Sequence, residues 1–374
     1  MKREGAPRLI DVAEAAGVSL ASASRAMTGG SGISPEVAAH VRVIAKQLGY
    51  EPNMHARGLA GGLVPTIGLV VHEIGDPYFS DIASGVIRSA TLENRSVQIA
   101  QADRTPDSEL AQVKSLLRQR VGSIIIAGSG YADSDREQGM SEALLDFTLA
   151  GGRAAVIGRH HLPVDAVLPD NHGAGVSVGR HLAGLGHRRI GVVAGPLDLN
   201  TVADRIAGLR EGTDGTGVEL TVISRAFTRE GGIEGARELL DRDVTAIVGL
   251  NDAMAIGILS ELRQHGIRVP EEMSVVGFDD IAVAADVAPA LTTARIPMFD
   301  MGRHAVSLIL RPASDEARTI ETTHELIVRG SSGPPRTAPR GGGGLGGGGA
   351  GCRSCARGSF GVALRSESLT KEKQ

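Results

Sequence analysis

Short aliphatic runs alternate with amphipathic segments along most of the chain, from Pro65 to about Arg329. Strands covered on both faces show continuous apolar runs, whereas helices with one buried face show apolar residues every three or four positions. The runs that predict strands are Thr66–Val71, Val97–Ala100, Ser123–Ala127, Ala154–Ile157, Arg189–Ala194, Ala246–Leu250, Ser274–Phe278 and Ile327–Val328. The segments that predict helices are Ile82–Leu92, Glu109–Gln119, Ala174–Leu185, Gly232–Asp241, Ala253–His265 and Phe299–Leu310.

This alternation predicts an α/β fold with parallel sheets joined by right-handed helical crossovers. The strands are too many for one compact lobe, so we expect two doubly wound parallel sheets in a two-lobed domain over residues 64–330. Lobe 1 would take about 64–163 plus 294–320, and lobe 2 about 164–293 plus 321–330. The periodicity then ends, and the glycine-rich segment that follows predicts a disordered tail over 331–374.

Residues 1–50 follow a different pattern, that of three short helices. The first covers Leu9–Ala16, and the turn Gly17–Ser19 supplies a left-handed stop and an N-cap for a second helix over Leu20–Met27. Ser34 and Pro35 are suited to begin a third helix, whose apolar stripe consists of Val37, Val41, Ile44 and Leu48. This layout is typical of a helix-turn-helix headpiece, although spacing alone leaves open a small helical cap with no role on DNA.

The second helix favours the DNA-binding alternative. Its outer face carries Ser19, Ser22, Ser24 and Arg25, which are short hydrogen-bonding side chains and one long cation. Such a face can approach phosphates and base edges closely.

Residues 51–63 form a linker that we expect to act as a hinge. The part from Pro52 to Ala60 could form about two helical turns, but so short a helix is marginal in water and Gly58 weakens it further. The hinge helix is therefore expected to fold only where two copies meet on DNA.

The headpiece and hinge resemble the LacI/GalR family of repressors. The similarity rests on the order and spacing of Ile10–Ala13, Ala16–Ser19, Ala21–Arg25, Leu48–Asn53 and Ala56–Leu59. The remainder, to about Arg329, fits the same family through Gly186–Gly191, Asn251–Ala255, Ser274–Asp280 and Pro289–Thr293. The chain departs from the family pattern at Ala23, where valine is usual, and at Met54 and His55 in the hinge.

The resemblance implies roles on DNA for two groups of residues. In the headpiece they are Ser19, Leu20, Ala21, Ser22, Ser24 and Arg25, with Leu20 and Ala21 beginning the recognition helix. In the hinge they are Asn53, Ala56, Arg57 and Leu59, with Leu59 as a wedge between base pairs of the minor groove. Alternatively, Leu59 packs on its own domain. Paired headpieces imply a homodimer and a pseudo-palindromic double-stranded operator.

Polar residues follow several of the predicted strands at their carboxyl ends, where ligands of α/β folds bind. Arginine, amide and carboxylate groups with one or two aromatic rings suit a polyhydroxylated ligand. The family resemblance implies a periplasmic-binding-protein-like sensor whose effector contacts are Tyr78, Phe79, Thr201, Arg205, Phe227, Asn251 and Asp279. Leu199 stands where purine-binding members carry arginine, so a sugar is the expected effector. Asp252 is interpreted as a helix N-cap, and His187 as a structural residue.

Composition narrows the function further. The net charge is -4, yet the first 62 residues carry seven basic and five acidic side chains, so that a headpiece at +2 precedes a remainder at -6. The chain shows neither a signal-peptide pattern nor a membrane-length apolar run, which favours the cytoplasm and argues against the main alternative, a solute-binding protein of a sugar transporter.

Enzymatic activity, a cofactor and a metal site are not expected. We find no glycine-rich phosphate loop, nucleophile elbow or cluster of metal ligands, and His160, His161 and His187 lack carboxylate partners at useful spacing along the chain. Cys352 and Cys355 lie in the tail without a second pair. The sequence therefore predicts a dimeric, sugar-responsive transcriptional repressor.

Overall fold

The computed structural model describes residues 7–28, 32–50 and 64–336 of the 374-residue chain. The hinge, with Asn53, Ala56, Arg57 and Leu59, lies outside the described residues, and so does the tail from Thr337 onward. Within the described ranges, no helix is both long and apolar enough to cross a membrane.

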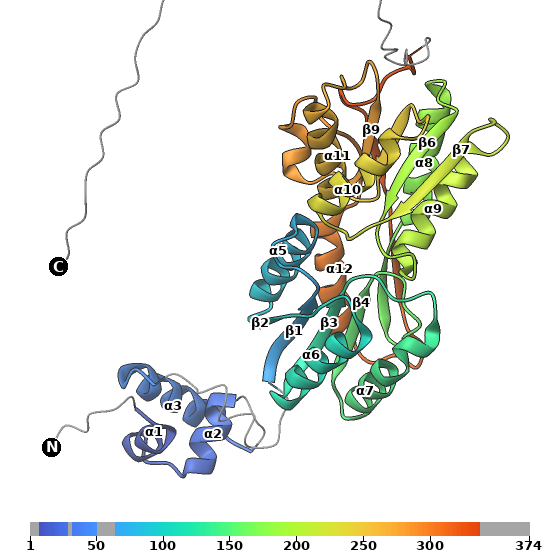
Figure 1. Ribbon diagram of the computed structural model, residues 1–374. Helices are drawn as coiled ribbons and strands as arrows, with labels where there is room; N and C mark the ends of the chain where they lie inside the picture. Colours follow the sequence, from blue (N-terminus) through green and yellow to red (C-terminus); the bar gives the residue numbers. More distant parts are fainter. Residues whose placement is uncertain (1–6, 29–31, 51–63, 337–374) are drawn as a thin grey trace, which may run out of the picture. The chain divides into compact units, whose positions relative to one another are not determined.

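The headpiece consists of α1 (Leu9–Ala15), α2 (Leu20–Thr28) and α3 (Pro35–Gln47), as predicted (Figure 1). Gly17 has a φ of 64°, which is the left-handed conformation expected at the end of α1. The Ser19 hydroxyl accepts a hydrogen bond from the Ser22 backbone N–H at 3.1 Å, and that of Ser34 accepts one from Val37 at 3.3 Å. Both predicted N-caps are therefore present.

The predicted apolar stripe of α3 was half right, because Val41 is buried and Ile44 packs against the headpiece core. Val37 and Leu48 are 37% and 41% exposed, whereas Ala38, Val41 and Ala45 are buried against α1 and α2. The reason is packing distance, because alanines on either side of Val41 let two short helices approach α3 closely.

The rest of the described chain forms two α/β lobes, each built on one six-stranded sheet. The first sheet has the order β11-β5-β4-β3-β1-β2 and the second β12-β10-β9-β8-β6-β7. The strands of the first sheet are β1 (Val64–Val71), β2 (Ser96–Gln101), β3 (Val121–Ala127), β4 (Arg153–Ile157), β5 (Asp165–Pro169) and β11 (Thr319–Thr322). Those of the second are β6 (Arg189–Ala194), β7 (Glu219–Ser224), β8 (Ala246–Gly249), β9 (Ser274–Asp279), β10 (Thr292–Arg295) and β12 (Glu325–Ile327).

Helices cover both faces of each sheet, which confirms the doubly wound architecture (Figure 1). In the first lobe, α5 (Pro77–Leu92) packs with α12 (Met298–Leu310), and α6 (Pro106–Arg118) packs with α7 (Gln138–Leu149). In the second lobe, α8 (Asn171–Gly184) packs with α9 (Asn200–Thr213), and α10 (Arg229–Leu240) packs with α11 (Asp252–Gln264). The core between these layers is predominantly aliphatic, with Val, Ile, Leu and Ala in most buried positions.

One strand departs from the predicted parallel pairing. β12 runs antiparallel to β10, whereas the other pairs in both sheets are parallel. Only two residues separate β11 from β12, so the chain passes from one lobe into the other without a crossover helix that could reverse its direction.

The predicted lobe boundaries were wrong by a few residues at each crossing. β5 was assigned to lobe 2 but pairs with β4 in the first sheet, and the end of β10 pairs with β9 in the second. The third crossing falls after Thr322, at the end of β11, because each crossing follows a strand instead of preceding it.

The ordered chain also extends beyond residue 330, where the predicted tail began. Ser331 is fully buried, and its hydroxyl donates to the Val275 carbonyl at 2.6 Å. The Gly333 N–H donates to the Ser274 hydroxyl at 3.0 Å. Residues up to Arg336 therefore belong with the second lobe, because they satisfy polar groups at the start of β9.

Candidate functional site

The predicted DNA contacts of the headpiece lie on one side of α2 and at its N-terminus. Leu20 is 50% exposed although it is a large apolar residue, and Ser19, Ala21 and Arg25 are also exposed. Ser22 and Ser24 are half-buried, and the opposite side of the helix packs Ala23 and Ala26 into the headpiece core. The structure therefore presents these six residues on an accessible helix flank.

The second site is a small pocket between the two lobes, lined from the carboxyl ends of strands in both sheets. Every predicted effector residue lines it, namely Tyr78, Phe79, Thr201, Arg205, Phe227, Asn251 and Asp279. The lining also includes Asp76, Arg104, Gly128, Ser129 and Leu199. Of these, Arg104 and Ser129 were not predicted from the sequence, although they follow β2 and β3. The expectation that ligands bind at the carboxyl ends of parallel strands applies to these two residues as well.

Arg205, in the second turn of α9, is the most extensively bonded side chain of this pocket. Its Nε donates to the Asn171 side-chain oxygen at 2.8 Å, and its Nη2 donates to an Asp279 carboxylate oxygen at 2.8 Å. Nη1 donates to the Leu250 carbonyl. The guanidinium also lies 4.8 Å from the centroid of the Phe278 ring. One arginine thereby ties together the start of α8, the residue after β8 and the end of β9.

Asp279 has an unusual backbone. Its φ is 105°, a conformation that residues with a side chain seldom adopt, and the next residue, Asp280, has a φ of 56°. Burial raises the pKa of the Asp279 carboxyl, and the neighbouring Arg205 opposes that shift. Strained backbone of this kind concentrates at ligand-binding sites, where surrounding contacts hold it in place.

Two adjacent polar residues at the start of α11 have different roles. The Asn251 side chain caps the helix, accepting from the Met254 N–H at 2.8 Å. The interpretation of Asp252 as the N-cap was therefore wrong: its fully buried carboxylate accepts from the Thr293 hydroxyl at 2.6 Å and from the Ile281 N–H at 2.9 Å. Burial raises the pKa of Asp252 well above its usual value, with the Asp279 charge adding to that shift.

Aromatic rings from both lobes border the pocket. Tyr78 and Phe79 begin α5 and pack edge to face, with ring centroids 5.0 Å apart, and Phe227 follows β7 in the other lobe. The Arg104 guanidinium lies 5.4 Å from the Phe79 centroid and 5.5 Å from that of Phe227. Burial lowers the Arg104 pKa and raises that of the Tyr78 phenol, so the pocket is a desolvated environment with both aromatic and charged groups.

Beside the pocket the lobes are joined by direct bonds between the loop after β3 and the start of α9. The Asn200 N–H donates to the Gly130 carbonyl at 2.9 Å, and its side-chain amide donates to the Tyr131 carbonyl at 3.0 Å. A bidentate ion pair joins Arg159 of the first lobe to Asp204 of the second, at 2.6 and 3.0 Å. These bonds hold the two lobes at the angle seen in the structure.

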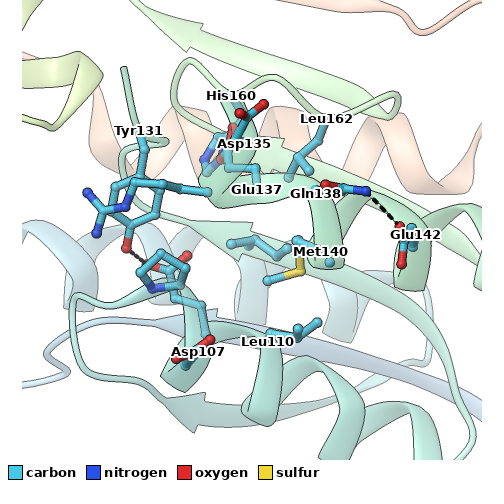
Figure 2. Close-up of a pocket in the computed structure, with 15 residues that line it drawn as sticks. Asp107, Leu110, Tyr131, Asp135, Glu137, Gln138, Met140, Glu142, His160 and Leu162 are labelled. Carbon is cyan, nitrogen blue, oxygen red and sulfur yellow. Dashed lines mark hydrogen bonds and ion pairs between the residues drawn. The ribbon is translucent and has the colours of Figure 1, made fainter. Parts of the chain in front are cut away.

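A separate cavity of about 490 Å³ lies within the first lobe, between α6 and α7 (Figure 2). The Tyr131 hydroxyl points to Glu109 and donates to it at 2.7 Å. The same carboxylate oxygen lies 2.8 Å from His72 Nε2, and the whole group is buried. Because Phe79 packs edge to face on His72, with centroids 5.5 Å apart, this network supports the floor of the interlobe pocket.

The same region corrects the expectation that the histidines lack carboxylate partners. His160 Nδ1 lies 2.6 Å from a Glu137 carboxylate oxygen, although 23 positions separate the two residues. Burial alone would raise the pKa of Glu137, but the hydrogen bonds from His160 and the His161 backbone outweigh burial and lower the pKa. His187 is buried, with its ring nitrogens 2.8 Å from the Thr245 hydroxyl and 2.9 Å from the Gly333 carbonyl, in agreement with a structural role.

The fold and the pocket define a two-lobed small-molecule-binding domain in the same chain as a helix-turn-helix headpiece. The chain belongs to the LacI family of bacterial transcriptional regulators. Residues 8–53 match the family model for bacterial regulatory proteins of the lacI family, and residues 180–332 match that for a periplasmic binding protein-like domain.

Individual relatives agree with this assignment over nearly their whole length. The HTH-type transcriptional regulator CelR of Thermobifida fusca is 34% identical, over 88% of this chain and 100% of the relative. A CelR–cellobiose complex is 30% identical with a TM-score of 0.64, covering 87% of this chain and 100% of that one. The lac repressor dimer bound to operator and the anti-inducer ONPF is 25% identical with a TM-score of 0.75, covering 88% of this chain and 100% of that one.

These similarities are to transcriptional regulators and not to enzymes, and they do not favour the solute-binding-protein alternative, because the match includes the headpiece. Among the described residues, no group of three or more His, Cys, Asp or Glu side chains is placed to hold a metal ion.

Proposed function

We propose that this protein is a transcriptional repressor that binds a pseudo-palindromic operator as a homodimer and changes its operator affinity when a sugar binds between its lobes. The observation that carries this proposal is the pocket in which Arg205, Asn251 and Asp279 meet aromatic rings from both lobes. Hydroxyl groups of a sugar can accept from guanidinium and amide N–H groups and donate to carboxylates, while its C–H face packs on the rings.

On DNA, α2 is proposed to enter the major groove. Leu20 and Ala21 offer only apolar contact, for instance to a thymine methyl group, so hydrogen bonds to bases and phosphates come from the serines of α2 and from Arg25. Asn53, Ala56, Arg57 and Leu59 are proposed to occupy the adjacent minor groove in a paired hinge. Binding to chromosomal DNA implies action in the cytoplasm.

The effector is proposed to act by its different affinity for two arrangements of the lobes. The direct bonds between the lobes, such as the ion pair of Arg159 with Asp204, fit the present angle between the lobes and would differ at another angle. A ligand that contacts both lobes therefore biases the angle by the difference in its binding free energy, and the paired hinges transmit that bias to the headpieces.

The test begins with the purified full-length chain and fragmented genomic DNA from its source. Recovery of a discrete set of fragments sharing an inverted repeat is expected, and the repeat then serves as a labelled probe for fluorescence anisotropy. Adding sugars one at a time should change the apparent dissociation constant by about tenfold or more for the effector, which is a coupling free energy of about 1.4 kcal/mol.

A matched pair of variants separates the two sites. Phe227→Ala should bind the operator as the wild type does but lose the response to the sugar, whereas Arg25→Ala should lose operator affinity and keep the sugar-induced shift in Tm. The proposal fails if no inverted repeat is enriched, or if the Phe227 variant responds to the sugar as the wild type does.

A further inference from the structure

The cavity of the first lobe is separate from the interlobe pocket, and the function proposed above makes no use of it (Figure 2). Its volume is about 490 Å³, which lies within the range of roughly 300–1,000 Å³ for pockets that hold small organic molecules. It is lined by residues of the first turns of α6 and α7, of β3, and of the loops after β3 and β4. The chemistry of that lining decides which class of molecule fits.

Glu109 lines the cavity and has one carboxylate oxygen without a partner. The residue is only 4% exposed, and both hydrogen bonds that it accepts, from Tyr131 Oη at 2.7 Å and from His72 Nε2 at 2.8 Å, reach the same oxygen, Oε1. Within the described ranges, Oε2 has no hydrogen-bond partner, and Glu109 forms an ion pair with no lysine or arginine. Oε2 keeps accessible surface, unlike the unpaired and sealed Nδ1 of His72, so it can accept from a molecule in the cavity.

The hydrogen bonds to Glu109 come from neutral groups. A protonated His72 ring would bury the N–H group of Nδ1 without an acceptor among the described residues, so the geometry fits the neutral ring, which donates through Nε2. Burial and the charge of Glu109 raise the pKa of the Tyr131 phenol, which therefore keeps its proton. Because buried charges in proteins are paired, a cationic ligand would supply the partner that the Glu109 carboxylate lacks.

The other charges of the lining also favour a cation. Arg136 is engaged with Asp198 and lies 4.2 Å from the centroid of the Tyr131 ring, and His160 is engaged with Glu137. The N-terminal ends of α6 and α7 add about half a positive charge each, so that five carboxylates leave the lining negative by about two charges even with both basic side chains charged. These carboxylates belong to Asp107, Glu109, Asp135, Glu137 and Glu142.

Much of the remaining lining is apolar. Leu110 of α6, Ile126 of β3 and Met140 of α7 contribute to it, together with Leu162 from the loop after β4. A hydrated inorganic cation would leave these side chains in contact with water, whereas the hydrocarbon part of an organic cation would cover them. The cavity therefore suits a molecule with a charged end and an apolar body.

We propose that this cavity binds a small organic amine, whose ammonium group donates to Glu109 Oε2 and whose hydrocarbon part packs on Leu110, Met140 and Leu162. The proposal goes beyond sugar sensing, because it assigns a second ligand site to the first lobe alone. The site also adjoins the joint between the lobes, where the Tyr131 carbonyl accepts from the Asn200 side chain at 3.0 Å.

The first experiment measures binding to the full-length protein by isothermal titration calorimetry. Phenethylamine is compared with phenylethanol, benzylamine with benzyl alcohol, and hexylamine with hexanol, so that each amine has a neutral counterpart of nearly the same shape. We expect at least one amine to bind to a single site per chain and about tenfold or more tightly than its alcohol, because a hydrogen bond between two charged groups is lost in the alcohol. If every alcohol binds as tightly as its amine, or if no amine binds, the proposal is wrong.

The second experiment locates the amine with two variants. Glu109→Gln keeps an acceptor for His72 and Tyr131 but removes the charge, and it should lower the affinity for the amine about tenfold while leaving that for the alcohol within about threefold. Leu162→Trp fills the cavity and should abolish amine binding, whereas the control Leu162→Met, which conserves volume, should bind the amine as the wild type does. Wild-type affinity in Leu162→Trp would place the amine elsewhere and overturn the proposal.

Surface variants decide the question even if Glu109→Gln does not fold. Asp107→Asn changes an exposed side chain of the cavity lining and should lower amine affinity about twofold or more. Asp103→Asn makes the same change of charge at an exposed residue outside that lining, and Phe227→Ala changes the interlobe pocket; both should bind the amine as the wild type does. If either control lowers amine affinity as much as Asp107→Asn, the amine does not occupy the cavity and the proposal is wrong.

Discussion

The ion pair between Arg205 and Asp279 offers the sharpest test of the pocket's electrostatics. Both side chains are nearly inaccessible, with 3% and 4% of their surface exposed. In Arg205→Met the aliphatic stem is largely kept, but every donor is lost. The Asp279 carboxylate then remains buried without a partner, and the Asn171 and Leu250 oxygens lose theirs.

The magnitude follows from these losses. Removing one member of a buried ion pair costs about 3–5 kcal/mol, and each unsatisfied buried acceptor costs about 1–3 kcal/mol. Water entering through the neighbouring interlobe pocket offsets part of the second cost. We therefore expect Arg205→Met to lower the free energy of unfolding by about 4 kcal/mol at pH 7.5.

The loss of stability in Arg205→Met should become smaller as the pH falls. Burial raises the Asp279 pKa and Arg205 opposes the shift, so removing Arg205 raises that pKa further. A carboxyl whose folded-state pKa exceeds its unfolded value destabilises the protein when ionised and stops doing so once it is protonated. The stability gap between variant and wild type should therefore narrow as the pH falls from 7.5 to 5.5.

Urea unfolding followed by far-ultraviolet circular dichroism measures these differences in the main transition. Adding Asp279→Asn to Arg205→Met removes the buried, unpaired carboxylate and should restore about 2 kcal/mol or more of the free energy of unfolding. Asparagine is the suitable partner because it tolerates the positive φ of this position better than an aliphatic residue. A loss below about 1 kcal/mol, or a double variant no more stable than the single one, would refute the argument.

Three further changes test packing, capping and the hinge. Gly208→Ala should lower the free energy of unfolding by about 2 kcal/mol or more, because the new Cβ would lie 2.0 Å from a backbone oxygen of α8. In the control Gly184→Ala the new Cβ would have no atom within 4 Å, so this variant should be neutral or stabilising in the same urea unfolding measurement. Ser34→Ala should lower headpiece stability by about 1 kcal/mol through loss of the N-cap of α3, measured by thermal unfolding, and an unchanged melt would contradict that role. Leu59→Gly, in the hinge outside the described residues, should weaken operator binding in fluorescence anisotropy and leave sugar binding intact; equal operator affinity would remove its wedge assignment.

Local signals predicted the elements with continuous or strictly periodic patterns. β1, β3, β6, β8 and β9 are aliphatic runs buried on both faces, so composition alone identifies them. The three headpiece helices are bounded by glycine and by capping residues, which act within one turn of the chain. The seven residues named from the family resemblance line one pocket at the carboxyl ends of the strands, and their role as effector contacts stays a prediction.

Other features depend on contacts that the local pattern does not contain. β5, with its sequence DAVLP, and β11, with TIET, are short and half-exposed, and they become strands only because β4 offers an edge for β5, which in turn offers one for β11. α7 was not predicted, because its sequence QGMSEALLDFTL mixes apolar, polar and acidic residues and shows only a weak helical pattern. The boundaries between lobes depend on which sheet has a free edge, and so they were misplaced.

The buried ionic pairs show the same limit in the site itself. Glu109 and Glu137 look like ordinary solvent-exposed helix residues in the sequence, yet both are buried against histidines far away along the chain. Their cost of burial is offset by His72, Tyr131 and His160, which lie at the ends of β1, β3 and β4. Because a buried carboxylate without a partner is costly, each acidic residue depends on a histidine or tyrosine that the local sequence does not reveal.

The same logic separates the two arginines of the cleft. Arg205 holds loops of its own lobe in place, and the loss of its bonds would be felt with or without a ligand. Arg104 contacts one aromatic ring in each lobe, and its charge also interacts with the carboxylates of Asp76 and Glu73, so it bridges the lobes. A change in the contact between the lobes would therefore disturb the contacts of Arg104 first and leave the bonds of Arg205 intact, because Asn171, Leu250 and Asp279 all belong to the lobe of Arg205 itself.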